Sequence, residues 1–172
     1  MNLLLCDLET TGLDPTKGQI LEVYAAKLSA LPRPGIQSEY HAIAHVKKDD
    51  YPIDPVVEKM HTGNGLWVEC ARSSLTQEQV LEGLEEYLWT KTHEKWVMVG
   101  DSVHFDRGWL LAKRPSLPLS HRVVDVSGFS RVLKSVRPLV SDRRAGASLS
   151  HRADSDARGS LRHLRDMLEG LK

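Results

Sequence analysis

Apolar positions in the first 46 residues fall into short runs or alternate with polar ones, and short breaks separate them, in a pattern typical of strands. Three segments are predicted to be strands: residues 2–8, 19–28 and 38–46. Turn residues, including glycine and proline, fill the gaps between them. One face of the third segment is apolar or aromatic and carries Tyr40, Ala42, Ala44 and Val46. Consecutive strands with short breaks between them favour an antiparallel meander.

From residue 54 onward, helix-type and strand-type segments alternate. Helical spacing and capping residues predict five helices: residues 54–60, 76–89, 101–111, 127–134 and 154–168. Asp54, Thr76 and Ser127 are the N-cap residues expected for three of them. Two short apolar runs predict further strands: residues 96–99 and 122–126. Residues 61–66 are predicted to form a loop.

The polar segment 137–150 contains glycine and serine and predicts a mobile connection before the last helix. Neither an internal repeat nor a second domain is predicted. The pattern therefore predicts one α/β domain over residues 1–172. Its central sheet is mixed, with an antiparallel leading meander followed by parallel strands, and helices flank it.

Composition supports a compact soluble protein. The chain has 172 residues, of which 41% are hydrophobic, and this is enough for one domain with a sizeable core. The apolar start, Met1 to Cys6, is too short for a signal segment, and no run approaches a membrane span. Cys6 and Cys70 are the only cysteines, which suits a reducing compartment. We expect a cytoplasmic protein that has no membrane partner.

Charge is distributed unevenly although the formal net charge is zero. Residues 1–106 carry 9 basic and 17 acidic side chains, a net charge of −8, whereas residues 107–172 carry 14 basic and 6 acidic ones, a net charge of +8. An acidic half that binds metal and a basic half that contacts phosphate predict one site at their junction. The alternative, two solvated faces that pair with each other or with a partner subunit, stays open.

The first strand carries two acidic residues, Asp7 and Glu9, at its end. Side chains alternate across a strand, so the two carboxylates share a face about 7 Å apart along the backbone. Unless each takes up a proton, such a pair needs cations, and hard oxygen ligands select magnesium or manganese. The alternative is an ordinary edge strand with two solvated acids.

Two further carboxylates stand at junctions that lead into helices: Asp106 and Asp156, the second five residues after His151. This order, Asp-x-Glu on a first strand, a middle Asp and a late His-x4-Asp, resembles the DEDDh exonucleases of the ribonuclease H-like fold. Within that group the chain is most similar to the oligoribonuclease family over nearly its full length. The matches are residues 7–15, 61–62 with 65–66, 102, 106–107, 122 with 125–127, and 151–153 with 156.

The resemblance implies a ribonuclease H-like fold and a metal-dependent 3′-to-5′ exoribonuclease that releases 5′-mononucleotides from very short RNA, dinucleotides above all. It assigns two divalent cations, Mg2+ or Mn2+, to four ligands: Asp7, Glu9, Asp106 and Asp156. His151 would be the general base, because histidine side chains titrate near neutral pH. The expected partners are short single-stranded RNA or dinucleotides and a second copy in a homodimer.

Substrate contacts are also carried over from the resemblance. Leu13 corresponds to a wedge between two bases, and His61 to a ring that supports a base. A cap over the 5′ phosphate would come from Ser102, Arg122 and Ser127. Plain alternatives stay open for three of these residues: turn packing for Leu13, a helix C-cap for His61 and a surface ion pair for Arg122.

The chain departs from the family pattern in the region of this cap. Asp101 stands where the family usually has Asn, and it adds negative charge there. His121 stands where the family usually has a Tyr that reaches the partner's site, and it is a further candidate for substrate binding. Arg131, in the same predicted helix as Ser127, is another.

Three other functions stay open at this stage. They are a proofreading-type DNA exonuclease, a nuclease of signalling dinucleotides, and a non-catalytic module that binds oligonucleotides. A capped site predicts a steep loss of rate beyond two or three nucleotides, so the dependence of rate on length separates the readings.

Overall fold

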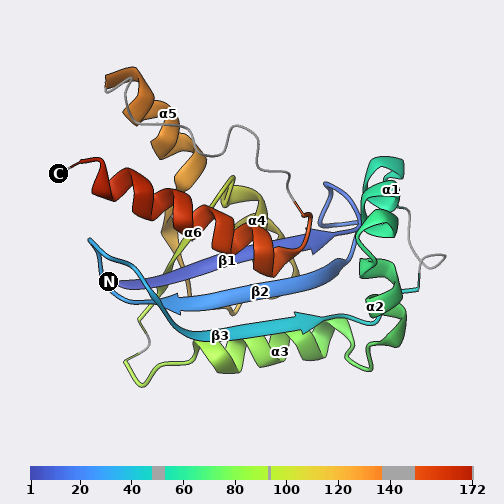
Figure 1. The fold of residues 1–172 in the computed structure, drawn as a ribbon. Helices are drawn as coiled ribbons and strands as arrows, with labels where there is room; N and C mark the ends of the chain where they lie inside the picture. The colour runs from blue at the N-terminus through green and yellow to red at the C-terminus, as the bar shows by residue number, and fades with distance from the viewer. Residues whose placement is uncertain (48–52, 93, 137–149, 172) are drawn as a thin grey trace.

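A five-stranded mixed sheet forms the centre of the molecule (Figure 1). The computed structural model describes residues 1–47, 53–92, 94–136 and 150–171. The strands are β1 (Asn2–Thr10), β2 (Ile20–Leu28), β3 (Ile36–Ile43), β4 (Trp96–Gly100) and β5 (Leu119–Asp125), in the spatial order β3-β2-β1-β4-β5. The first three pair antiparallel, whereas β4 pairs parallel with both β1 and β5. The predicted antiparallel meander followed by parallel strands is confirmed.

In the described ranges, six helices accompany the sheet: α1 (Pro55–Gly63), α2 (Leu66–Arg72), α3 (Gln77–Leu88), α4 (His104–Lys113), α5 (Val126–Val136) and α6 (Ala153–Glu169). Helices α5 and α6 pack on one face of the sheet, and α3 and α4 pack on the other. In Figure 1, α6 runs along β1 and β2, while α1 and α2 lie beyond the end of β1.

Strand β1 contributes to both layers of the core because its side chains alternate. Leu3 and Leu5 face α6, whereas Leu4, Cys6 and Leu8 belong to the opposite cluster. Since each buried leucine contributes about 2 kcal/mol, this double burial makes β1 the rigid element of the fold. The acids at its end are therefore held on a fixed support.

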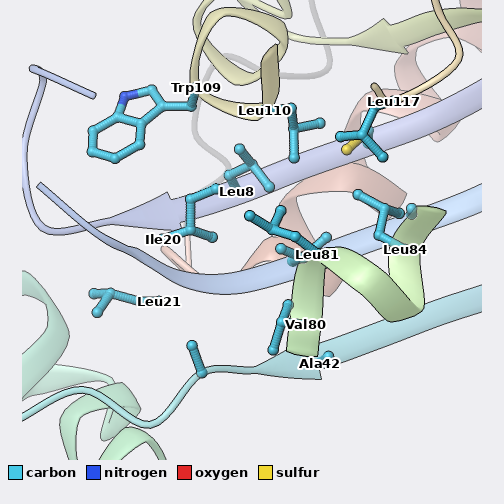
Figure 2. Close-up of a cluster of buried hydrophobic side chains, with 14 of the residues drawn as sticks. Leu8, Ile20, Leu21, Ala42, Val80, Leu81, Leu84, Trp109, Leu110 and Leu117 are labelled. Carbon is cyan, nitrogen blue, oxygen red and sulfur yellow. The ribbon is translucent and has the colours of Figure 1, made fainter. Parts of the chain in front are cut away.

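Figure 2 shows the cluster on the α3 and α4 side. Leu8 of β1 and Ile20 of β2 lie among Leu81 and Leu84 of α3 and Leu110 of α4. Helix α3 begins as expected, because Thr76 and Gln79 form a capping box. Packing from this side fixes the direction in which the odd-numbered side chains of β1 point.

The structure corrects several predicted boundaries. The predicted loop at 61–66 is wrong, because α1 continues to Gly63 and α2 begins at Leu66. The third strand ends at Ile43 instead of residue 46, although Ala44 and Val46 still enter the core. Helix α4 starts at His104 and β5 at Leu119, each about three residues later or earlier than expected.

The N-terminal cap of α5 also differs from the prediction. The Asp125 carboxylate accepts hydrogen bonds from the Gly128 N–H (2.8 Å) and from the Ser127 hydroxyl (2.6 Å). Asp125 therefore caps this helix, and Ser127 lies in its first turn.

The segment 137–150, for which the sequence predicts a mobile connection, lies outside the described residues except for Ser150. Within the described ranges, none of the helices has the length and hydropathy that crossing a membrane requires.

Candidate active site

Asp7 and Glu9 lie on the α6 face of β1, where they continue the row of Leu3 and Leu5. Asp156 in the first part of α6 faces them from above the sheet. Each of the three side chains offers one carboxylate oxygen, and these oxygens all lie within 4.8 Å of one another. One cation could therefore contact all three.

Asp106 reaches the same place from α4. Its side chain is only 4% exposed, and its Oδ1 accepts a hydrogen bond from the backbone N–H of Leu8, at 3.1 Å. That N–H belongs to the residue between Asp7 and Glu9, so Asp106 stands beside the pair. The structure thus brings together all four carboxylates that the sequence singles out.

The electrostatics of this cluster are unfavourable without a counter-ion. Burial, followed by repulsion from Asp106, Glu9 and Asp156, raises the pKa of Asp7 to about 10. Burial and the neighbouring acids Asp156 and Glu22 raise the pKa of Glu9 to about 8. A cluster of hard oxygen donors that must either keep protons or gain positive charge fits divalent cations well.

The pKa of Asp106 is also raised, but less than the pKa values of Asp7 and Glu9. Burial raises the pKa of its carboxyl to about 7, although the hydrogen bond from Leu8 opposes the shift. A group this deeply buried contacts little water, so a proton or a cation must supply most of the compensation.

His151 is attached to Asp156 through its backbone. The N–H of His151 donates to Asp156 Oδ2 at 3.1 Å, and the N–H and hydroxyl of Ser150 donate to Oδ1 at 3.2 and 3.0 Å. The base candidate and the metal-ligand candidate therefore form one local unit at the start of α6.

Two candidate site residues have unusual backbones. Among the non-glycine residues that the structure describes, Ser102 (φ 52°) and His151 (φ 51°) alone have positive φ. This left-handed conformation costs an L-residue about 1–2 kcal/mol, and such strain concentrates at functional sites. Both residues flank the carboxylate cluster.

Comparison with known proteins gives this geometry a family. The family model described as Exonuclease matches residues 4–164, nearly the whole chain. The chain belongs to this exonuclease family. The similarity to oligoribonucleases that the motifs predicted is also confirmed.

Two curated relatives show the extent of this similarity. The mitochondrial oligoribonuclease of Saccharomyces cerevisiae is 30% identical over 180 residues, which cover 94% of this chain and 64% of the yeast protein. The oligoribonuclease of Nocardia farcinica is 30% identical over 171 residues, which cover 92% and 75% of the two chains. This chain therefore spans somewhat less than two thirds of the yeast relative.

Among solved structures, the complex of E. coli ExoI with single-stranded DNA and a zinc ion has a TM-score of 0.77 at 16% identity. The match covers 98% of this chain but only 40% of the ExoI chain. At this level of identity the likeness concerns the fold, and it confirms the ribonuclease H-like α/β architecture that was expected.

The loop after β1 carries Leu13, the candidate wedge between two bases. The loop is closed by a hydrogen bond from the Thr11 N–H to the Gln19 carbonyl (2.9 Å) and a second from the Gln19 N–H to the Thr11 hydroxyl (2.9 Å). Leu13 at its tip is 78% exposed. Plain turn packing, the alternative weighed for Leu13, does not describe a side chain this exposed.

Two of the three cap candidates, Ser102 and Ser127, lie at one edge of the sheet. Gly100 and Asp125 are register partners at the carboxyl ends of β4 and β5. Ser102 and Ser127 each come two residues after one of these partners, so both lie at the same end of the two strands. Arg122, on β5, is exposed. The other two candidates, His121 and Arg131, are also exposed.

His61 lies beside the carboxylate cluster. Its ring is fully buried inside α1, with Nε2 3.5 Å from the Glu9 carboxylate. Burial lowers the pKa of His61 to about 4, so the ring is neutral at pH 7. Contact with a base stays a prediction, and in this structure the ring packs against Glu9 instead.

Sequence reasoning missed an ion-pair network beneath the site. Glu22 of β2 is the register partner of Glu9 and is completely buried. Its carboxylate accepts from Arg152 at 3.0 Å, from His41 at 2.7 Å and from the Ala153 N–H at 3.0 Å. The available signal was an acid within the apolar run of residues 20–26.

Arg152 also binds Glu69 of α2 with two hydrogen bonds, at 2.7 and 2.9 Å. Burial would raise the pKa of Glu22, but hydrogen bonds from His41, Arg152 and Ala153 outweigh it and lower this pKa to about 2. The network fastens the start of α6 to β2 and α2, and so holds Asp156 above the sheet.

Asp101 follows β4 close to the cluster. Its carboxylate accepts a hydrogen bond from the Ser160 hydroxyl of α6 and contributes to the raised pKa of Asp7. The negative charge that the sequence placed near the cap is therefore also sensed by the metal-ligand candidates.

Proposed function

We propose that this chain is a 3′-to-5′ exoribonuclease that hydrolyses very short RNA, with dinucleotides favoured, to 5′-mononucleotides. One observation carries the proposal. Three carboxylates, from Asp7, Glu9 and Asp156, converge within 4.8 Å, with Asp106 beside them, in a chain of the exonuclease family. The relatives named oligoribonuclease support the choice of short RNA as substrate.

The cluster is proposed to hold two divalent cations, Mg2+ or Mn2+. Four carboxylates carry a charge of −4 when ionised, which two such ions balance, so an anionic phosphodiester can then approach a site of low net charge. Asp7 would contact both ions, Glu9 and Asp156 would complete one shell, and Asp106 would complete the other. When bound, the ions supply Lewis-acid stabilisation of the phosphoryl oxygens.

His151 is proposed as the general base. The attacking water would give its proton to the imidazole as its oxygen bonds to phosphorus. The bond from phosphorus to the 3′ oxygen of the preceding nucleotide would break, and that oxygen would take up a proton from solvent to leave as a hydroxyl group. The backbone attachment of His151 to Asp156 supports this role, because it places the base next to a ligand of the proposed metal site.

Leu13 and the sheet edge are proposed to select the substrate. An exposed leucine on a closed loop can insert between two bases without reading their sequence. Ser102, Arg122 and Ser127, with His121 and Arg131 as further candidates, would contact the terminal 5′ phosphate of the 5′ nucleotide and end the site there. Such a cap favours dinucleotides and disfavours polymers.

A length series tests this proposal. The purified protein is incubated with 5′-phosphorylated RNAs of two, three, five and ten nucleotides and with the matching DNAs, with Mn2+ or with a chelator. We expect metal-dependent release of 5′-mononucleotides, with the highest kcat/KM on the RNA dinucleotide. Equal rates on all lengths, or a preference for DNA, would favour the proofreading-type alternative, and absence of turnover would favour a binding module.

A homodimer in the cytoplasm completes the proposal. His121 is exposed at the position where the family usually places an aromatic residue that reaches the partner. The two cysteines are buried and unpaired, which suits a reducing compartment. Light scattering at micromolar concentration tests the dimer, and a monomer mass would contradict it.

A further inference from the structure

The side chain of Asn64 lies between two helices and the segment that carries His151. Asn64 is the C-cap residue of α1, and its backbone N–H donates to the Met60 carbonyl at 3.2 Å. Its side-chain nitrogen donates to the carbonyl of His151 at 2.5 Å and lies 3.3 Å from the carbonyl of Ser150 and 3.5 Å from Nδ1 of His61. The amide of Asn64 therefore contacts two residues, Ser150 and His151, that lie 86 and 87 positions later in the sequence.

The orientation of this amide is determined by its other partner. The Asn64 Oδ1 accepts a hydrogen bond from the Leu66 N–H, the first residue of α2, at 3.0 Å. An amide oxygen can only accept and an amide nitrogen can only donate. Since the oxygen is used by α2, the nitrogen must face the two carbonyls, where a donor is required.

The segment on the other side of this contact needs support. His151 has a φ of 51°, which a residue with a side chain adopts only when its surroundings hold it there. The His151 N–H donates a hydrogen bond to the Asp156 carboxylate at 3.1 Å, and the His151 carbonyl accepts one from the Asn64 amide. Both peptide groups of this one residue are therefore fastened, one to α6 and one to the end of α1.

We infer that Asn64 is a positioning residue that holds the backbone of His151 in its left-handed conformation and thereby aims the imidazole at the carboxylate cluster. This inference rests on the proposed role of His151 as general base. Asn64 does not touch the reacting atoms and acts through His151. The sequence motifs gave no hint of it, because the contact joins α1 to a segment far along the chain.

Two substitutions separate this role from the capping of α2. Asn64→Ser keeps an oxygen that can accept from the Leu66 N–H but is too short to reach His151. Asn64→Asp keeps the shape and the acceptor, and it turns a carboxylate oxygen toward two carbonyl oxygens. Thr62→Val is the matched control, because the Thr62 hydroxyl donates within α1, to the Glu58 carbonyl at 2.7 Å.

We expect both Asn64 variants to stay folded, with unfolding midpoints close to that of the wild type. On an RNA dinucleotide with Mn2+, kcat should fall about tenfold or more while KM changes less than about twofold, since displacing a general base costs part of its 10²- to 10⁴-fold contribution. In a His151→Ala background the same substitutions should change kcat less than about twofold. Thr62→Val should match the wild type.

A second measurement does not depend on activity. Hydrogen exchange of the His151 amide in the metal-free protein should speed up about tenfold or more in Asn64→Ser, because the backbone of His151 loses one of its two hydrogen bonds, the one from Asn64 to its carbonyl. An equal fall of kcat in both backgrounds, or unchanged exchange at His151, would overturn the inference. If the wild-type protein cleaves no dinucleotide, the proposed function fails, and the exchange measurement still decides whether Asn64 holds His151.

Discussion

The guanidinium of Arg152 lies 3.0 Å from the carboxylate of Glu22, a residue 130 positions earlier in the chain and completely buried. Glu22 is the register partner of Glu9, and Arg152 is the N-cap residue of α6. The pair therefore joins β2, the strand that pairs with the one carrying Asp7 and Glu9, to the helix that carries Asp156. A buried ion pair of this kind stabilises little in itself, but breaking it leaves an uncompensated charge.

Replacing Arg152 by methionine should destabilise the fold by about 3 kcal/mol, because Glu22 then stays buried and, of its two side-chain partners among the described residues, keeps His41 alone. Urea unfolding measures the change. Arg158→Met is the matched control, since Arg158 also lies on α6 but pairs with Glu39, an acid that is 39% exposed. That substitution should cost less than about 1 kcal/mol. Equal losses in the two variants would contradict the importance of burial at Glu22.

The metal-free protein should lose stability as the pH rises from 7 to 8.5. The pKa of Asp7 is raised to about 10 and that of Glu9 to about 8, whereas both groups ionise near pH 4 in the unfolded chain. Over this range the folded state holds protons that the unfolded state has released, so the free energy of unfolding falls by about 1.4 kcal/mol per pH unit for each retained proton.

The pKa of His61, lowered to about 4, does not alter this trend, because above pH 7 the ring is neutral in both states. Urea unfolding in the presence of a chelator tests the prediction. Addition of Mn2+ should raise the free energy of unfolding most at pH 8.5. A flat profile without metal would show that the carboxylates do not repel one another as the geometry implies.

Asp7→Asn should raise stability and abolish activity together. The substitution removes a buried carboxylate that repels Asp106, Glu9 and Asp156, so the metal-free protein should gain about 1 kcal/mol or more at pH 8. It also removes the residue proposed to contact both cations, so kcat should fall by about 10³-fold or more. Thermal unfolding and turnover of the same preparation provide both values, and a loss of stability would argue against repulsion at this position.

Much of the site could be predicted because its chemistry is local in the sequence. Asp7 and Glu9 stand two apart on an apolar strand, and strand alternation alone places them on one face. Asp156 follows His151 within a short segment that leads into α6. The capping box at Thr76 is local too, and α3 begins where it indicates.

The rest depends on contacts between distant segments. Helix α2 was missed because glycines at 63 and 65 flank its start and because a helix of 7 residues is stabilised mainly by packing of Leu66, Trp67 and Cys70. The residues next to Glu22 in the sequence do not indicate its countercharge, which is Arg152 at the start of α6. The contact between His61 of α1 and Glu9 of β1 also joins distant segments, and the contact of His61 with a base stays a prediction.

Gly100→Ala should damage the site through the backbone. A Cβ on Gly100 would lie 2.8 Å from the carbonyl oxygen of Cys6, which immediately precedes Asp7 on the neighbouring strand. A backbone atom cannot move aside without shifting β1, so we expect a loss of about 1–3 kcal/mol and a lower kcat. In Gly108→Ala, the matched control in α4, the new Cβ meets nothing within 4 Å and should stabilise by about 0.5–1 kcal/mol. Urea unfolding and dinucleotide turnover distinguish the two.

Leu13→Ala should weaken the use of dinucleotides without weakening the fold. The side chain is 78% exposed at the tip of a hydrogen-bonded loop, so its removal costs the folded state almost no buried area. If it separates the two bases, kcat/KM on an RNA dinucleotide should fall about tenfold, the value of about 1.4 kcal/mol of lost contact. Val132→Ala is the control, because Val132 is 61% exposed on α5 and has no proposed contact with substrate. Steady-state kinetics on the dinucleotide and on p-nitrophenyl uridine 5′-phosphate, which offers a single base, completes the test. A wedge predicts a loss on the first substrate only, and equal losses on both would assign Leu13 to the shape of the loop instead.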